Sequence, residues 1–208
     1  MSPMLHLSQD PEADRLISEN PLALLIGMVL DQQVPLEWAF AGPAELKRRI
    51  GGLVVSDIAS MDPEELTGAF SARPALHRFP GSMATRVLEL CRVVADRYED
   101  DASNVWKGAK SGSELLARVR ELPGFGDRKA KIFVALLGKQ LGVRPPGWKD
   151  ASAPFSEPGS FQSVADIVDP ETLAKVRAFK QQLKRSTGHE GRRKMRVAKK
   201  AKTDDLRP

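Results

Sequence analysis

The stretch LPGFGDRKAKIFVALLGKQ, residues 122–140, predicts a tight turn between two helices. Residues 111–121 before it have a helical pattern, with Ser113 as the predicted N-cap. After it, Ala130, Phe133, Val134 and Leu137 recur at the spacing of one face of an amphipathic helix. Because the link at residues 123–126 is short, we expect the two helices to lie antiparallel or to cross steeply.

Two glycines, Gly124 and Gly126, leave the backbone N–H groups of this turn uncovered by side chains. These groups lie at the start of a helix, where the macrodipole adds about half a positive charge. Arg128, Lys129 and Lys131 follow at once. The functional interpretation is a main-chain site for a phosphate. The alternative is an ordinary corner between helices, in which the glycines serve only packing.

The pattern Leu-Pro-Gly-hydrophobic-Gly, followed by basic residues and an alanine, resembles the helix-hairpin-helix of the HhH-GPD base-excision DNA glycosylases. This superfamily includes endonuclease III and 3-methyladenine glycosylase II. The same hairpin also occurs in polymerases, ligases and nuclease subunits. Three further features extend the resemblance over residues 20–140: a buried helix ending in Gln32-Gln33, a helix start with the sequence DPEE, and a glycine turn at Gly81.

The resemblance implies an all-α fold with two helical lobes. Residues 20–140 would form a helical barrel that ends in the hairpin, and residues 1–19 together with 141–184 would form the second lobe. Within the barrel we expect a central buried helix at residues 22–33 and a helix at 36–50 that is interrupted at Gly42-Pro43. We expect His77 to lie in a surface loop.

The composition excludes several kinds of site. A single cysteine, Cys91, allows neither an internal disulfide nor a four-cysteine zinc or iron–sulfur site, and it favours a reducing compartment. No apolar run reaches about 18 residues, so no membrane span is expected. We therefore predict a cytoplasmic protein, associated with the nucleoid if it is bacterial. The resemblance to the glycosylases further implies a monomer whose partner is double-stranded DNA with a damaged base.

Positive charge is concentrated at the end of the chain. The net charge is +5, and residues 184–208 alone contain ten Lys or Arg against three Asp or Glu. Few apolar residues accompany them, so we predict a disordered basic tail at 185–208. This tail is interpreted as an arm that binds phosphates without sequence preference; a solubilising or targeting segment is the alternative.

The resemblance also implies how DNA is held. Gln33, or else Gln32, would enter the duplex near an extruded base, where a glutamine can bond to an orphaned base edge. The alternative is a solvated helix end. The residues that would hold the phosphate backbone are Gly124, Phe125, Gly126, Arg128 and Lys129.

Glycosylases of this family carry a catalytic aspartate after the hairpin. A carboxylate is needed because positive charge develops on the sugar as the glycosidic bond breaks. Here the first carboxylate is Asp150, about four residues late and without the flanking Thr-His of the family pattern. We predict Asp150 as the catalytic residue, with a helix cap or turn as its alternative role. Asp166 and Asp169 are interpreted as a loop residue and a helix cap.

A second departure concerns strand cleavage. Bifunctional members use a lysine two residues after the second hairpin glycine, and this position is Arg128 here. A guanidinium stays protonated and cannot form a Schiff base, so no lyase activity is expected. The hairpin of the family often binds a monovalent cation through main-chain carbonyls, which by position are those of Arg120, Leu122 and Phe125. No other cofactor is predicted.

Three hypotheses about function follow. The leading one is a monofunctional DNA glycosylase that hydrolyses the N-glycosidic bond of a damaged base. The second is a non-catalytic module of the same fold that recognises damaged or distorted DNA, and the displaced Asp150 favours it. The third is a helical scaffold for other proteins.

Overall fold

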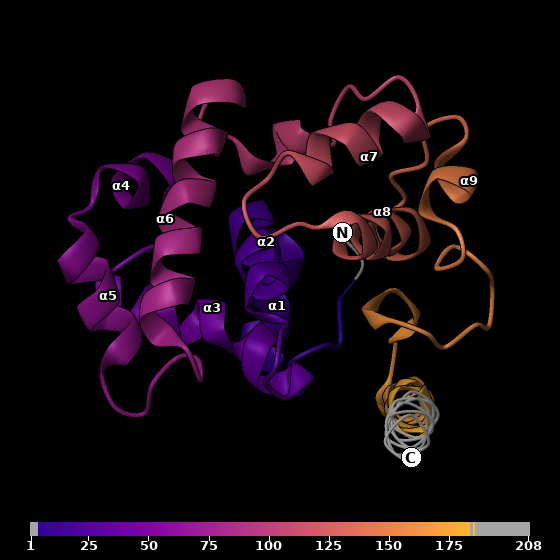
Figure 1. Ribbon diagram of the computed structural model, residues 1–208, viewed down its shortest axis with the longest axis horizontal. Coiled ribbons are helices and arrows are strands. Elements are labelled where there is room, and N and C mark those ends of the chain that lie inside the picture. The colour runs from indigo at the N-terminus through magenta and orange to yellow at the C-terminus, as the bar shows by residue number, and fades with distance from the viewer. Residues whose placement is uncertain (1–3, 184, 186–208) are drawn as a thin grey trace, which may run out of the picture.

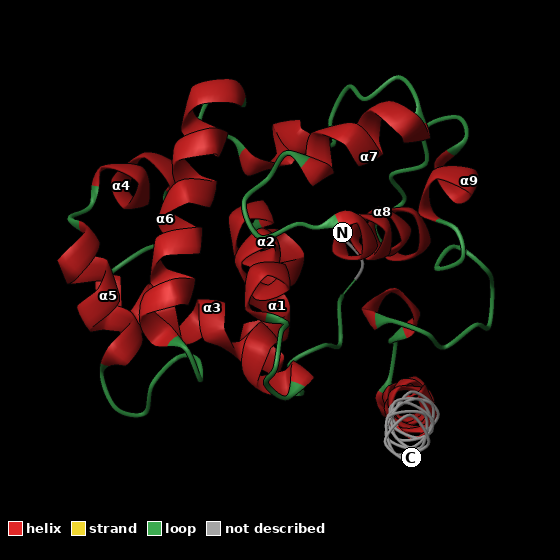
Figure 2. Cartoon of the chain, viewed as in Figure 1, coloured by secondary structure: helices red, strands yellow, loops and turns green. Residues whose placement is uncertain are grey.

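The computed structural model describes residues 4–183 and residue 185. The elements in this part of the chain are all helical, as Figures 1 and 2 show, which confirms the predicted all-α class. They are α1 (Pro11–Glu19), α2 (Pro21–Leu30), α3 (Leu36–Ile50), α4 (Val55–Ser60), α5 (Pro63–Ser71), α6 (Pro80–Arg97), η1 (Ala102–Val105), α7 (Gly112–Arg120), α8 (Asp127–Gln140), α9 (Trp148–Ser152) and η2 (Val164–Asp166). Residues 170–183 are also helical. Apart from Arg185, the predicted basic tail lies outside the described residues.

Helix α2 is the buried centre of the molecule. Asn20 caps it by accepting from the N–H of Ala23 at 3.0 Å, and Pro21 occupies its first position. Every residue from 22 to 30 is buried, and the helix packs against α1, α3 and α6. The predicted central helix is therefore confirmed, although it ends at Leu30 and leaves Asp31 and the two glutamines in a turn. Among the described residues, no helix is both long and apolar enough to cross a bilayer.

Helices α7 and α8 form the hairpin, α9 packs against both of them, and η2 packs against α8. Figure 1 shows α4, α5 and α6 on one side of α2 and the hairpin with α9 on the other. The buried apolar side chains form one continuous cluster that runs from Leu5 to Val176. The division into two lobes remains a prediction.

Helix α3 contradicts one prediction, because it continues through Pro43 without interruption. Its neighbour Gly42 faces α2, and a Cβ built on it would lie 2.6 Å from Leu30 Cδ1. The close packing of α2 and α3 therefore outweighs the backbone hydrogen bond that Pro43 removes.

One helix start differs from the sequence-based expectation, and another agrees with it. The N-cap of α7 is Ser111, whose hydroxyl accepts from the N–H of Glu114 at 3.1 Å, so the prediction of Ser113 is wrong. The cap at Ser111 satisfies a first-turn donor, whereas Ser113 already lies inside the helix. Asp62 caps α5 through the N–H groups of Glu64 and Glu65, as the DPEE sequence indicates.

Candidate nucleic-acid interface

A groove of about 1050 Å³ joins the turn after α2 to the start of α8. Residues 31–35 form one wall, and residues 126–129 with Ile132 form the opposite one. Arg78, residues 162–164 and Lys180 complete the lining. The turn with the two glutamines and the hairpin, separated by about 90 residues of sequence, thus border the same space.

In the hairpin turn, the Phe125 side chain is buried in the core, whereas the backbone at Gly126 is exposed. Gly124 has a left-handed backbone, with φ of 86°, and a Cβ there would lie 3.3 Å from a methyl group of Val29. Phe125 is buried edge-on against Phe133, with ring centroids 5.6 Å apart. Gly126 is the N-cap of α8; no side chain caps this helix end, and no atom lies within 4 Å of a Cβ built on Gly126. The first-turn N–H groups of α8 are therefore open to an anion.

The charges around this helix end are partly compensated. Arg128 is exposed at the groove, and its guanidinium lies 5.0 Å from the ring centroid of Phe155. Asp127 accepts from the guanidinium of Arg120 and forms an ion pair with Lys131 at 3.6 Å. The hydrogen bond from Arg120 lowers the pKa of Asp127. The acidic residue in the first turn is thus neutralised by two cations, while Arg128 remains available.

Lys129 points to the end of α2. Its ammonium donates to the carbonyls of Met28, at 2.6 Å, and Val29, at 3.2 Å. Carbonyls of the last helical turn have no intrahelical partner, so the lysine caps α2 from the neighbouring helix. Burial lowers the pKa of Lys129 to about 8, and the charge of Asp31 acts in the opposite direction. Lys129 therefore links the hairpin to the turn after α2.

The two glutamines have different surroundings. The Gln32 amide donates to Val29 O at 2.7 Å and accepts from Arg86 at 2.8 Å, so it is part of the protein's own hydrogen-bond network. Gln33 is exposed at the groove and has a left-handed backbone, with φ of 58°. This conformation costs a non-glycine residue about 1–2 kcal/mol. Of the two candidates for insertion into DNA, Gln33 is the one whose side chain is accessible.

His77 lies in the core and not in a surface loop, so that prediction is wrong. Its side chain is 1% exposed, its Nε2 lies 2.9 Å from Gln32 O, and its Nδ1 accepts from the N–H of Phe79 at 3.0 Å. Both ring nitrogens are thereby satisfied, which allows the ring to be buried. Burial lowers the pKa of His77. The histidine connects the glutamine turn to the loop before α6.

That loop carries two side chains that the sequence did not single out. Arg78 lines the groove, and its guanidinium lies 5.3 Å from the ring centroid of Phe79. Phe79 is 41% exposed, but it is not among the described residues that line the groove. An Arg-Phe pair in a loop is a weak signal in sequence, because only the fold shows that Arg78 lines the groove.

The predicted catalytic residue, Asp150, lies elsewhere. It is exposed in α9, which packs against α7 and α8, and it is not among the described residues that line the groove. Its neighbours Trp148 and Lys149 line a different cavity of about 610 Å³. The structure therefore does not bring Asp150 together with Gln33 and the hairpin turn in the groove.

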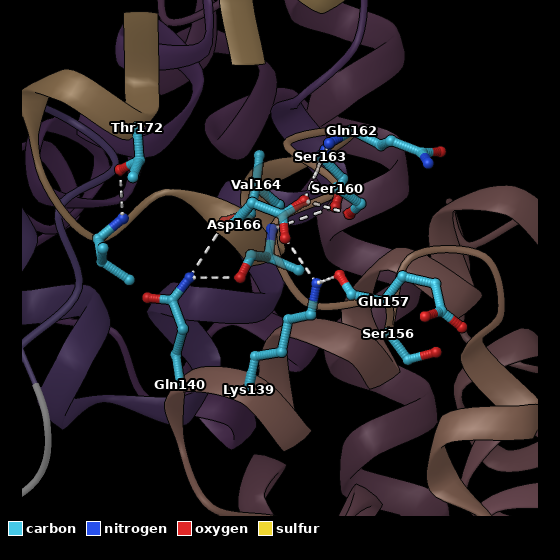
Figure 3. A network of polar contacts seen from close by, with 12 residues as sticks. Lys139, Gln140, Ser156, Glu157, Ser160, Gln162, Ser163, Val164, Asp166 and Thr172 are labelled. Carbon is cyan, nitrogen blue, oxygen red and sulfur yellow. Dashed lines mark hydrogen bonds and ion pairs between the residues drawn. The ribbon is translucent and has the colours of Figure 1, made fainter. Parts of the chain in front are cut away.

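Asp166 and Asp169 have structural roles, as expected. Figure 3 shows Asp166 at the centre of a polar network in which it accepts from Lys139, at 2.5 Å, and from the N–H of Gln162, at 2.9 Å. This network fixes the segment that contributes residues 162–164 to the groove. Asp169 caps the helix at residues 170–183 through the N–H of Thr172 at 2.7 Å.

The remaining site predictions concern metals and thiols. Within the described residues, no group of three or more His, Cys, Asp or Glu could hold a metal ion. Of the carbonyls proposed for a monovalent cation, that of Leu122 accepts from the N–H of Phe125 at 3.0 Å and keeps one lone pair for an ion. Burial raises the pKa of Cys91 to about 12, which makes this thiol inert.

The groove thus combines an open helix N-terminus, two arginines and an accessible glutamine. These groups suit an anionic ligand, because the helix end and the arginines attract phosphate. The exposed ring of Phe79, outside the described lining of the groove, offers a stacking surface beside Arg78. Comparisons with protein-family models, with curated proteins and with solved structures find no match to this chain.

Proposed function

We propose that this chain is a base-excision DNA repair protein of the helix-hairpin-helix glycosylase type. It would bind duplex DNA with a damaged base and hydrolyse the N-glycosidic bond of that base. One observation carries the proposal: the open N-terminus of α8 and the exposed Gln33 border the same groove of about 1050 Å³. This volume is at the upper end of that of small-molecule sites and would admit an extruded nucleotide.

In this proposal the hairpin grips the DNA backbone. A phosphate oxygen would accept from the uncapped N–H groups at the start of α8, with the Arg128 guanidinium beside it. Such contacts carry no sequence information but fix the register of the protein on the duplex.

Recognition of the damaged site would depend on the opposite wall. Extruding a base costs a few kcal/mol, and the cost is smallest where a base pair is already weakened. Gln33 would fill the vacated position and bond to the orphaned base, while the exposed ring of Phe79 would stack against a neighbouring one. Strand cleavage is not part of the proposal, because Arg128 cannot form a Schiff base and Lys129 is bound to the carbonyls of α2.

A second candidate function is non-catalytic recognition of damaged or distorted DNA. The exposed position of Asp150, outside the groove, favours it. Release of free bases from alkylated, deaminated and oxidised genomic DNA, measured by mass spectrometry against a heat-killed control, separates the two functions.

The binding step is tested with a matched pair of glutamine variants. Gln9, like Gln33, is exposed and left-handed, with φ of 64°, but it lies in the N-terminal segment away from the groove. Fluorescence anisotropy would compare an intact duplex with one that carries an abasic analogue. We expect Gln33→Ala to reduce the preference for the abasic duplex about tenfold, the equivalent of about 1.4 kcal/mol, and Gln9→Ala to leave it unchanged. A wild-type protein that binds neither duplex at low salt would refute the proposal and support the protein scaffold.

A further inference from the structure

Asp31 is a carboxylate that the groove already contains. It is the C-cap of α2, it is half-buried, and it lines the groove next to the two glutamines. Its own N–H donates to Gly27 O at 3.0 Å, and the next N–H donates to Leu30 O at 2.7 Å, so its backbone is held by the end of α2.

Asp31 occupies a helix end that is unusual for an acidic side chain, and the nearby ammonium of Lys129 offsets its charge. The C-terminus of a helix carries partial negative charge, and an acidic side chain there costs about 0.3–1 kcal/mol. In the part of the chain that the structure describes, the carboxylate of Asp31 also has no hydrogen bond from a protein donor. The nearby ammonium of Lys129 offsets the helix-end carbonyls of Met28 and Val29.

Asp127 is the other aspartate among the described residues that line the groove, and it does have protein partners. Its carboxylate is engaged by Arg120 and Lys131. Among the lining residues that the structure describes, Asp31 is therefore the aspartate whose carboxylate accepts no hydrogen bond from the protein.

The surroundings hold Asp31 rigidly. The following residue, Gln32, is fixed through its carbonyl by His77 and through its side chain by Arg86. On the other side, Lys129 binds the last turn of α2. The backbone of Asp31 is thus held on both sides, which keeps its side chain at the groove.

We infer that Asp31 is the catalytic carboxylate of this protein. The inference rests on the proposed function and assigns its chemical step. The C1′–N bond of the damaged nucleotide breaks, and its electron pair leaves with the base. Ionised Asp31 stabilises the positive charge that develops on the sugar. A water molecule then attacks C1′ and gives a proton to Asp31, which passes it to the departed base. The products are the free base and an abasic sugar, and Asp31 returns to its ionised form.

The test compares three aspartate-to-asparagine variants of the full chain. Asp31→Asn changes the proposed catalyst, Asp150→Asn changes the residue expected from the family pattern, and Asp57→Asn is a control at an exposed site in α4, away from the groove. Base release from the damaged genomic DNA is measured by mass spectrometry, and binding to the abasic-analogue duplex by anisotropy. We expect Asp31→Asn to lower the rate of base release about 100- to 1,000-fold while binding and Tm persist, and Asp57→Asn to change none of them.

Each other outcome overturns the inference. Base release that survives in Asp31→Asn, or that is lost in Asp150→Asn alone, removes Asp31 from the chemistry while the proposed function stands. A wild-type protein that binds the abasic duplex but releases no base overturns the inference in favour of the non-catalytic module. Absence of DNA binding by the wild type refutes the proposed function itself. Asp31→Ser, with Tm and circular dichroism, provides a second variant if Asp31→Asn fails to fold.

Discussion

Replacing Gly126 by Ser is expected to change stability and DNA affinity in opposite directions. Gly126 has φ of −72° and ψ of 170°, which any residue adopts, and no atom lies within 4 Å of a Cβ built on it. Ser is a preferred N-cap, and its hydroxyl would accept from the N–H of Arg128 or Lys129. The new cap, together with the reduced freedom of the unfolded chain, should raise the free energy of unfolding by about 0.5–1 kcal/mol.

The same hydroxyl would occupy the donors that the proposed phosphate needs. Loss of one charge-assisted hydrogen bond costs about 1.5–3 kcal/mol, which corresponds to roughly a 10- to 150-fold weaker Kd. Urea unfolding and anisotropy with an intact duplex measure the two effects. Gly52→Ser is the matched control, because Gly52 also has open space around its Cβ position but lies between α3 and α4. A Gly126→Ser protein that binds duplex as tightly as the wild type would refute the idea that this helix end holds a phosphate.

Three further expectations concern stability. Gly124→Ala should lower the free energy of unfolding by about 1–2 kcal/mol, because φ of 86° is unfavourable for alanine; urea unfolding measures it, and an unchanged midpoint would contradict it. Burial lowers the pKa of Lys129 from 10.5 to about 8. Between these values the unfolded chain binds more protons, so stability should rise with pH across this window, and Lys129→Met should remove that rise in urea titrations. Asp166→Ala should cost about 3–5 kcal/mol, because it leaves the mostly buried ammonium of Lys139 unpaired; Lys139→Met in the same chain should restore part of this loss, and no recovery would argue against the ion pair.

Local patterns were sufficient for the elements whose determinants are adjacent in sequence. The two glycines and the apolar periodicity predict the hairpin, and the Asn-Pro and Asp-Pro pairs predict the starts of α2 and α5. In each case a cap and the helix that it begins lie within four residues, so the hydrogen bonds follow from spacing alone. The sequence also places both glutamines just after the end of a buried helix. It does not show that Gln33 is exposed while Gln32 is bound to Val29 and Arg86.

Features that depend on packing between distant segments could not be predicted. The burial of His77 requires the carbonyl of Gln32, 45 residues away, as a partner for its ring. The continuity of α3 requires Gly42 to lie against α2. The composition of the groove was hidden for the same reason: Asp31 is adjacent to the glutamine turn in sequence, but only the fold shows that it faces the hairpin while Asp150 does not.

The contacts between Lys129 and the last carbonyls of α2 have a mechanical consequence. They join the start of α8 to the turn that carries Gln33, and the tight fit of Gly124 against Val29 adds a second connection. These contacts therefore hold the two walls of the groove at a fixed distance from each other. If DNA docks as proposed, the duplex has to deform to match that width, at a cost of a few kcal/mol that depends on its local stiffness. Such a protein would discriminate between DNA sites by their deformability, before it contacts the damaged base.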